Sequence, residues 1–225
     1  MKKVKVALGS KSYEIHIAAG LLTRVGASLK ETGFGGKVVI ITNPTLKRLY
    51  GDLLAQSLDQ DGFRVATLEV PEGEEQKSLE TAGRLYGELS RRYAERTTPI
   101  LALGGGVIGD LAGFVAATYM RGVPLIHIPT TLLAQVDSSI GGKVAINHGQ
   151  LKNVVGAFYQ PRRVISDIAT LKTLPPKEFA NGLAEVIKSA VIRDGAFFAF
   201  IEANLAKIRG LNEAVLEEVV FRSAS

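Results

Sequence analysis

The sequence predicts an α/β fold: a Rossmann-like, mostly parallel sheet with helices on both faces, followed by the beginning of an all-α domain. Two observations lead to this prediction. Short apolar runs alternate with longer segments of helical spacing from Val38 to Ser166, which is typical of strand–helix–strand units. After Leu174, Pro175-Pro176 breaks the chain and only helical pattern follows. We therefore expect an α/β domain over residues 1–174 and the first helices of a second domain over residues 175–225.

The elements follow in chain order from local signals. Alternating residues on either side of Gly9-Ser10 predict a β-hairpin at the N-terminus. Further along, Asn43-Pro44 ends one strand and Asp61-Gly62 turns the chain into another. The expected strands are Val4–Leu8, Tyr13–Ala18, Val38–Thr42, Phe63–Val70, Ile100–Leu103, Leu125–Ile128 and Arg163–Ser166, and the expected helices are Leu21–Glu31, Thr45–Asp59, Leu79–Tyr93, Phe179–Ile192, Phe197–Ile208 and Leu211–Arg222.

The central stretch is PILALGGGVIGDLAGFVAATYMR, in which a buried strand passes through glycines into a helical segment. Such a turn exposes backbone N–H groups at the positive end of the helix dipole, which favour a phosphate or pyrophosphate. The spacing Gly104-x-Gly106-x-x-Gly109 matches the dinucleotide fingerprint. However, Pro129-Thr130-Thr131 stands where ordinary Rossmann domains carry an acidic ribose-binding residue, so a dinucleotide would be held differently. A glycine turn that serves only close packing is the alternative.

Composition restricts the classes of function. The net charge is +5, but the cations are scattered and tryptophan is absent, so an anionic small molecule is better supported than nucleic acid. The absence of cysteine suits a reducing cytoplasm. The charged N-terminal segment is neither a signal peptide nor an anchor, and no apolar run is long enough to span a bilayer. We therefore expect a cytoplasmic protein without nucleic-acid or membrane partners.

Polar residues concentrate between Arg121 and Asn153, among glycines and segments of short strand character. Loops at the carboxyl ends of parallel strands are where open α/β sheets bind ligands. Gly141-Gly142 before Lys143 would let a ligand approach the backbone closely. For any single lysine of a basic chain, however, a solvated surface charge is the better interpretation. The polar residues are Thr130, Thr131, Asp137, Ser138, Ser139, Lys143, Lys152 and Asn153.

The helix predicted over Phe179–Ile192 carries Asn181, Glu185 and Lys188 on one face. Its other positions are largely apolar, and a carboxylate in such surroundings needs a partner. An ion pair between Glu185 and Lys188 and a role of Glu185 as metal ligand both fit this spacing.

No ready-made catalytic or metal motif is present. The histidines His16, His127 and His148 are far apart and form no H-x-x-x-H pair. His127 alternates within an apolar strand, so we interpret it as a core histidine. Neither a G-x-S-x-G element nor a P-loop lysine occurs.

The chain resembles 3-dehydroquinate synthase. The resemblance rests on GGGVIGDLAGFVAATYMRGVPLIHIPTTLLAQVDSSIGGKVAIN, LKNVVGAFYQP and LPPKEFANGLAEVIK, and extends more weakly through ITNPTLKRLYG and PEGEEQKS to the N-terminus. It implies an NAD⁺-binding α/β domain before a helical metal-binding domain, with the active site between them. It also implies a homodimer.

The resemblance further implies roles for individual residues, with cations facing the carboxylate and phosphate ends of an anionic sugar phosphate. Glu185 matches the first ligand of a divalent zinc or cobalt ion. Cofactor contacts would come from Asn43, Glu74, Lys77, Gly105, Gly106, Val107, Asp110, Thr130, Thr131, Lys143, Lys152, Thr170, Thr173 and Leu174. Substrate-pocket and catalytic positions would be Arg121, Asp137, Lys143, Lys152, Asn153, Glu185 and Lys188.

The implied reaction converts 3-deoxy-arabino-heptulosonate 7-phosphate into 3-dehydroquinate and phosphate, with NAD⁺ reduced and reoxidised in each turnover. The family's two metal-binding histidines have no counterpart in the sequence. We therefore expect the chain to be the front portion of a longer enzyme, able to bind NAD but weak or inactive in catalysis by itself.

Three alternatives stay open. Other sugar-phosphate cyclases share the implied mechanism and differ only in pocket details. Metal-dependent alcohol or glycerol dehydrogenases share the fold, but typically lack the DSSIGGK stretch found at residues 137–143. The third alternative is a non-catalytic nucleotide-binding module.

Overall fold

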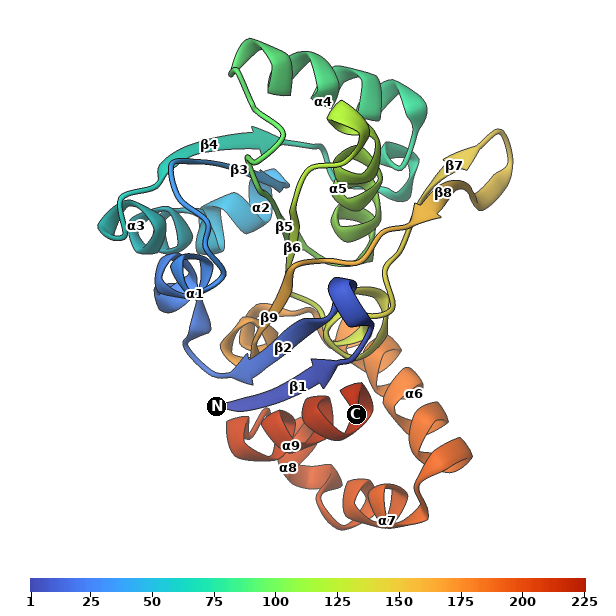
Figure 1. Cartoon of the computed structure of the whole chain (residues 1–225). Coiled ribbons are helices and arrows are strands. Elements are labelled where there is room, and N and C mark those ends of the chain that lie inside the picture. Colours follow the sequence, from blue (N-terminus) through green and yellow to red (C-terminus); the bar gives the residue numbers. More distant parts are fainter.

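The computed structural model describes all residues from 1 to 225, and its central feature is a seven-stranded sheet (Figure 1). The strand order is β1-β2-β9-β6-β5-β3-β4. Only β1 and β2 pair antiparallel, as the N-terminal hairpin, and the other neighbours are parallel. The predicted fold class is confirmed. The strands of this sheet are β1 Lys2–Val6, β2 Tyr13–Ala18, β3 Lys37–Thr42, β4 Arg64–Glu69, β5 Ile100–Gly104, β6 Leu125–Pro129 and β9 Arg163–Asp167.

Helices cover both faces of the sheet, with α4 and α5 on one side and α1 and α3 on the other (Figure 1). None of the helices is both long enough and apolar enough to cross a membrane. The α-helices are α1 Val25–Glu31, α2 Pro44–Leu46, α3 Asp52–Gln60, α4 Leu79–Arg91, α5 Gly106–Thr118, α6 Pro176–Arg193, α7 Gly195–Ala203, α8 Leu205–Arg209 and α9 Glu213–Ala224.

Strand β5 shows why the sheet is parallel and covered on both faces. All five of its residues are buried. Ile100 and Ala102 belong to the core under α4 and α5, whereas Leu101 and Leu103 belong to the core under α1 and α3. Because side chains alternate along a strand, a continuous apolar run needs cover on each face.

The helical segment after Leu174 is not separated from the sheet by a solvent-filled gap. Phe179 and Val186 of α6 and Leu216 and Val219 of α9 share one buried core with Ile15 of β2 and its neighbours. This core lies on the same face as α4 and α5, at the end of the sheet formed by the N-terminal hairpin. The domain division after Leu174 stays a prediction.

A second hairpin, β7 Lys143–His148 and β8 Leu151–Phe158, extends away from the main sheet (Figure 1). It packs on α5 through a close approach, because a Cβ placed on Gly113 would lie 2.3 Å from Val144 Cγ1. The small residues of α5 therefore allow this hairpin to pack closely against the helix. The sequence indicated short strand character here without predicting the hairpin.

Two predicted helices have internal irregularities. The helix expected over Thr45–Asp59 contains a π-helical turn, η3 Lys47–Gly51, between α2 and α3. The helix expected over Phe197–Ile208 divides at Asn204 into α7 and α8. There the Asn204 Nδ2 donates to the carbonyl oxygen of Phe200 at 2.9 Å, and such local side-chain bonds compete with a regular helix.

Candidate active site

The glycine turn opens the candidate site at the carboxyl edge of the sheet. β5 ends at Gly104, and α5 begins after Gly105 without any side chain capping its first turn. A Cβ on Gly105 would lie 2.9 Å from Thr131 Cγ2, and one on Gly106 would lie 3.4 Å from Ser138 Oγ. The start of α5 thus combines uncapped N–H groups with a surface free of side chains, which suits a phosphate group.

This turn forms one wall of a cleft of about 740 Å³, here called the large cleft. Most of the residues expected to contact a cofactor meet there, although they come from loops far apart in the sequence. Asn43 also has a structural role, since its Oδ1 accepts from the Leu46 N–H at 2.8 Å and caps α2. The predicted residues that line the large cleft are Asn43, Glu74, Lys77, Gly105, Gly106, Val107, Asp110, Thr130, Thr131, Lys152, Asn153, Thr173 and Leu174.

Lys77 is a buried cation at the base of this cleft, with only 4% of its surface exposed. Its Nζ donates to Asp110 Oδ2 at 2.7 Å and to Asn153 Oδ1 at 2.5 Å. Burial raises the pKa of the Asp110 carboxyl, and the hydrogen bond from Lys77 opposes that rise. The lysine therefore joins α5 to the β7–β8 hairpin.

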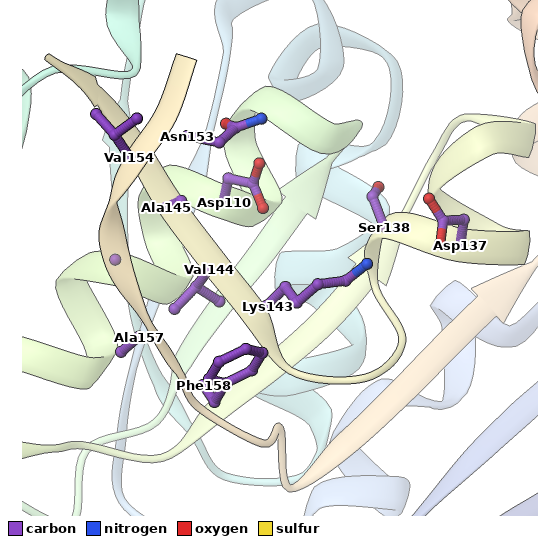
Figure 2. A pocket seen from close by; sticks show the side chains of 11 residues that line it. Asp110, Asp137, Ser138, Lys143, Val144, Ala145, Asn153, Val154, Ala157 and Phe158 are labelled. Carbon is purple, nitrogen blue, oxygen red and sulfur yellow. The ribbon is translucent and has the colours of Figure 1, made fainter. Parts of the chain in front are cut away.

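A second cavity of about 480 Å³, here called the hairpin cavity, adjoins the large cleft and shares Asp110, Ser138 and Asn153 with it. Figure 2 shows the Lys143 ammonium extended toward Ser138 and Asp137. No carboxylate lies within ion-pair distance of this ammonium. The other side of the cavity is apolar and is formed by Val144, Ala145, Val154, Ala157 and Phe158.

Glu185 and Lys188 lie on α6 and form an ion pair across one helical turn. The hydrogen bond from Lys188 to Glu185 raises the pKa of the lysine, and the charge of Asp137 acts in the same direction. α6 thus brings a cation close to the polar end of the hairpin cavity. Nowhere in the chain do three His, Cys, Asp or Glu side chains gather as a metal site would require.

Four predicted site residues line neither cavity: Glu185 and Lys188 of α6, described above, and Arg121 and Thr170. Arg121 is exposed and follows the C-terminal end of α5, about 20 Å along the helix from the glycine turn. It has a φ of 65° and lines neither cavity. Thr170 is buried, and its Oγ1 donates to the Asp167 carbonyl oxygen at 2.8 Å.

Three residues in or near the site were given no role in the sequence analysis: Ser138, Gln135 and Asn147. Ser138 lines both cavities, and its place in the polar stretch was the available signal. Gln135 is fully buried, and its Nε2 donates to Pro129 O, Asp167 O and Thr170 Oγ1, which ties the ends of β6 and β9 together. Its signal was a polar residue inside an apolar run. Asn147 bonds to Glu74 and Asn153, and no local sequence pattern indicated these contacts.

Comparisons with known proteins point to one enzyme family. The family model for the N-terminal part of 3-dehydroquinate synthase matches residues 67–181, and the model for the C-terminal part matches residues 182–225. The 3-dehydroquinate synthase of Dehalococcoides mccartyi strain 195 is 53% identical over the whole chain, and that of Desulforamulus reducens is 53% identical over 97% of it. The chain spans 63% and 61% of the lengths of these two relatives.

Solved structures of sugar-phosphate cyclases have the same fold. A 2-epi-5-epi-valiolone synthase from Streptomyces hygroscopicus with NAD⁺ and Zn²⁺ bound superposes with a TM-score of 0.87 at 28% identity, covering 97% of this chain and 61% of that one. A 2-deoxy-scyllo-inosose synthase complexed with carbaglucose-6-phosphate, NAD⁺ and Co²⁺ superposes with a TM-score of 0.78 at 26% identity, covering 98% and 65%. A glycerol dehydrogenase from Schizosaccharomyces pombe, at 19% identity, shares the fold alone.

Proposed function

The chain belongs to the 3-dehydroquinate synthase family, and from this premise we propose that it binds NAD⁺ in the large cleft and an anionic sugar phosphate in the hairpin cavity. The reaction served is the conversion of 3-deoxy-arabino-heptulosonate 7-phosphate into 3-dehydroquinate and phosphate. The observation that supports this proposal is the shared wall of the two cavities: the large cleft at the glycine turn adjoins a cavity into which the Lys143 ammonium extends.

The large cleft fits NAD⁺ in its chemistry. The uncapped start of α5 suits the pyrophosphate, and Gly105 and Gly106 leave room for it. Asn43, Glu74 and Lys77 stand at the side we assign to the adenosine, while Thr130 and Thr131 complete the pocket. When bound, NAD⁺ supplies a reversible hydride acceptor, so the reaction involves no net redox change.

We place the anionic substrate in the hairpin cavity, which Lys143 lines, while Lys152 lines the adjoining large cleft and Lys188 lies on α6. We assign Lys143, Lys152 and Lys188 to the phosphate and carboxylate groups, because an ammonium binds such oxygens through charge-assisted hydrogen bonds. Asp137 lines the hairpin cavity with Lys143, and its charge helps to raise the pKa of Lys188. We assign the Asn153 amide to the substrate hydroxyl groups. A substrate contact from Arg121 also stays a prediction.

The metal assignment rests on Glu185. This carboxylate is bound to Lys188 and has no second or third potential ligand beside it, so these residues alone do not make a metal site. We propose Glu185 as one ligand of a divalent zinc or cobalt ion, and derive no step through the ion.

The experiment that tests this function is a calorimetric titration of the chain with NAD⁺, followed by an assay of phosphate release from 3-deoxy-arabino-heptulosonate 7-phosphate by a full-length version of the enzyme. Saturable NAD⁺ binding supports the assignment of the large cleft, and its absence overturns it. Phosphate release without net NADH supports the cyclase reaction, whereas net NADH from a simple alcohol would identify a dehydrogenase. The identities of 53% to the synthases and 26–28% to other cyclases favour 3-dehydroquinate as the product.

The assembly is suggested by the family resemblance, and the location by the absence of cysteine. We propose a homodimer acting in the cytoplasm. Size-exclusion chromatography with light scattering tests the homodimer, and a monomer at micromolar concentration would contradict it.

A further inference from the structure

The β7–β8 hairpin contains an irregularity beside the shared wall of the two cavities. The strands pair regularly from Lys143↔Phe158 to Ile146↔Val155 and meet again at His148↔Leu151, so Asn147 alone faces residues 152–154. This is a β-bulge, and bulges re-aim side chains next to active sites. Within it, Asn153 adopts a φ of 58°, in the left-handed region where asparagine is enriched among residues other than glycine.

The side chain of Asn147 stabilises this bulge by replacing a missing backbone partner. Its Oδ1 accepts the N–H of Asn153 at 2.9 Å. In the bulged conformation, the amide oxygen of Asn153 accepts from the Lys77 ammonium at 2.5 Å. Asn147 therefore determines how the hairpin presents Asn153 to the shared wall.

The NH₂ group of the Asn147 side chain binds Glu74, which lies on the loop that precedes α4. The Asn147 Nδ2 donates to Glu74 Oε1 at 3.0 Å and more weakly to the Glu74 carbonyl oxygen at 3.4 Å. The Asn147 backbone N–H donates to the Lys77 carbonyl oxygen at 2.8 Å. One residue thus connects Glu74, Lys77 and Asn153, yet it lines neither cavity.

We propose that Asn147 is a positioning residue that sets the orientation of Glu74 and Asn153 and thereby couples NAD⁺ binding in the large cleft to the conformation of the β7–β8 hairpin. This inference rests on the proposed function, because its ligand is NAD⁺. An amide is needed at this position, since one group must accept from Asn153 and another must donate to Glu74.

Substitutions separate the two halves of this role. Asn147→Ala removes both hydrogen bonds. Asn147→Asp keeps an acceptor for the Asn153 N–H but places a carboxylate against Glu74. Adding Glu74→Gln to Asn147→Asp reverses the donor and the acceptor, so the bond can form again in the opposite direction. Asn204→Ala is the matched control, because it removes an asparagine hydrogen bond between α7 and α8.

The first measurement is the dissociation constant for NAD⁺ by calorimetry. We expect Asn147→Ala to weaken binding about tenfold and Asn147→Asp at least as much, because each loses a partly buried hydrogen bond. Because Glu74 itself lines the large cleft, the double variant is compared with Glu74→Gln alone and should bind NAD⁺ within about threefold of that variant, while Asn204→Ala stays at the wild-type value. A double variant that binds NAD⁺ at least about tenfold more weakly than Glu74→Gln, or an Asn147→Ala variant with wild-type affinity, overturns the proposal.

The second measurement does not depend on NAD⁺. Amide hydrogen exchange at Asn153 should be fast in Asn147→Ala and slow in the wild type and Asn147→Asp, since both of these supply the acceptor oxygen. Unchanged exchange in Asn147→Ala refutes the positioning role even if the wild type binds no NAD⁺. Failure of the wild type to bind NAD⁺, with the expected exchange pattern, refutes the proposed function instead.

Discussion

Lys77 and Asp110 form a hydrogen-bonded ion pair at the wall between the two cavities, with Nζ and Oδ2 2.7 Å apart. The lysine is buried and the carboxyl is largely so, and each compensates the other's loss of hydration. Because the lysine lies on the loop before α4 and Asp110 lies on the first turns of α5, the pair also holds the loop against the glycine turn.

Replacing Lys77 by methionine should destabilise the fold. The variant leaves the Asp110 carboxyl buried without its donor, so the pKa of that carboxyl should rise further above its usual range. We expect a loss of about 2–3 kcal/mol in the free energy of unfolding, measured in urea. Lys47→Met removes an exposed ion pair to Glu69 and should cost less than about 1 kcal/mol. Equal losses in the two variants would show that burial of the Lys77 pair has no special effect.

The glycines of the dinucleotide-like spacing should differ in their tolerance of alanine. A Cβ on Gly105 would press on Thr131 at 2.9 Å and fill the phosphate cradle, so Gly105→Ala should weaken NAD⁺ binding at least about tenfold. A Cβ on Gly109 would meet His127 at an ordinary 3.5 Å. Gly109→Ala should therefore keep NAD⁺ affinity and stabilise α5 by up to about 1 kcal/mol. Calorimetry and thermal unfolding measure both, and loss of binding in Gly109→Ala would contradict this distinction.

His127 should make stability depend on pH. It is fully enclosed in β6, and burial lowers its pKa from 6.5 to about 4. Below pH 6.5 this histidine binds a proton in the unfolded chain but not in the folded chain. The free energy of unfolding therefore has its full value above pH 6.5 and decreases as the pH falls toward 4. We expect this residue to account for a loss of about 2 kcal/mol between pH 7 and pH 5. Urea denaturation at both values should show that loss removed in His127→Gln, and an unchanged pH dependence in that variant would refute the assignment.

Much of this fold could be predicted because its signals are local. The apolar run of β5 and the glycines after it specify a strand, a turn and an uncapped helix within twenty residues, so the position of the glycine turn beside the large cleft followed from the sequence. Asn43-Pro44 likewise identified the end of β3, and the structure adds that the Asn43 side chain caps α2. The interpretation of His127 as a core histidine is confirmed by its burial.

The remaining features depend on contacts that no local pattern encodes. The role of Asn147 requires a bulge whose register is set by the pairing of two strands and by a loop seventy residues earlier. The position of Arg121 depends on the length of α5, which carries it away from the glycine turn. For Glu185, spacing allowed both an ion pair and a metal ligand, and the structure contains the ion pair with Lys188.

Lys143 should be the main determinant of anion binding in the hairpin cavity. Its ammonium extends into the cavity toward Ser138 and Asp137 without an ion-pair partner (Figure 2), so an incoming phosphate gains a charge-assisted bond that no protein group already uses. Lys143→Ala should weaken the binding of inorganic phosphate by at least about fivefold. The dissociation constant is measured from the NMR shift of the Ser138 amide during a phosphate titration at constant ionic strength. Lys5→Ala, which removes an exposed lysine of β1 far from the cavity, is the control for net charge and should change the affinity less than about twofold. Equal weakening in both variants would mean that the chain attracts phosphate through its overall positive charge, and the assignment of the hairpin cavity to the phosphate end of the substrate would be wrong.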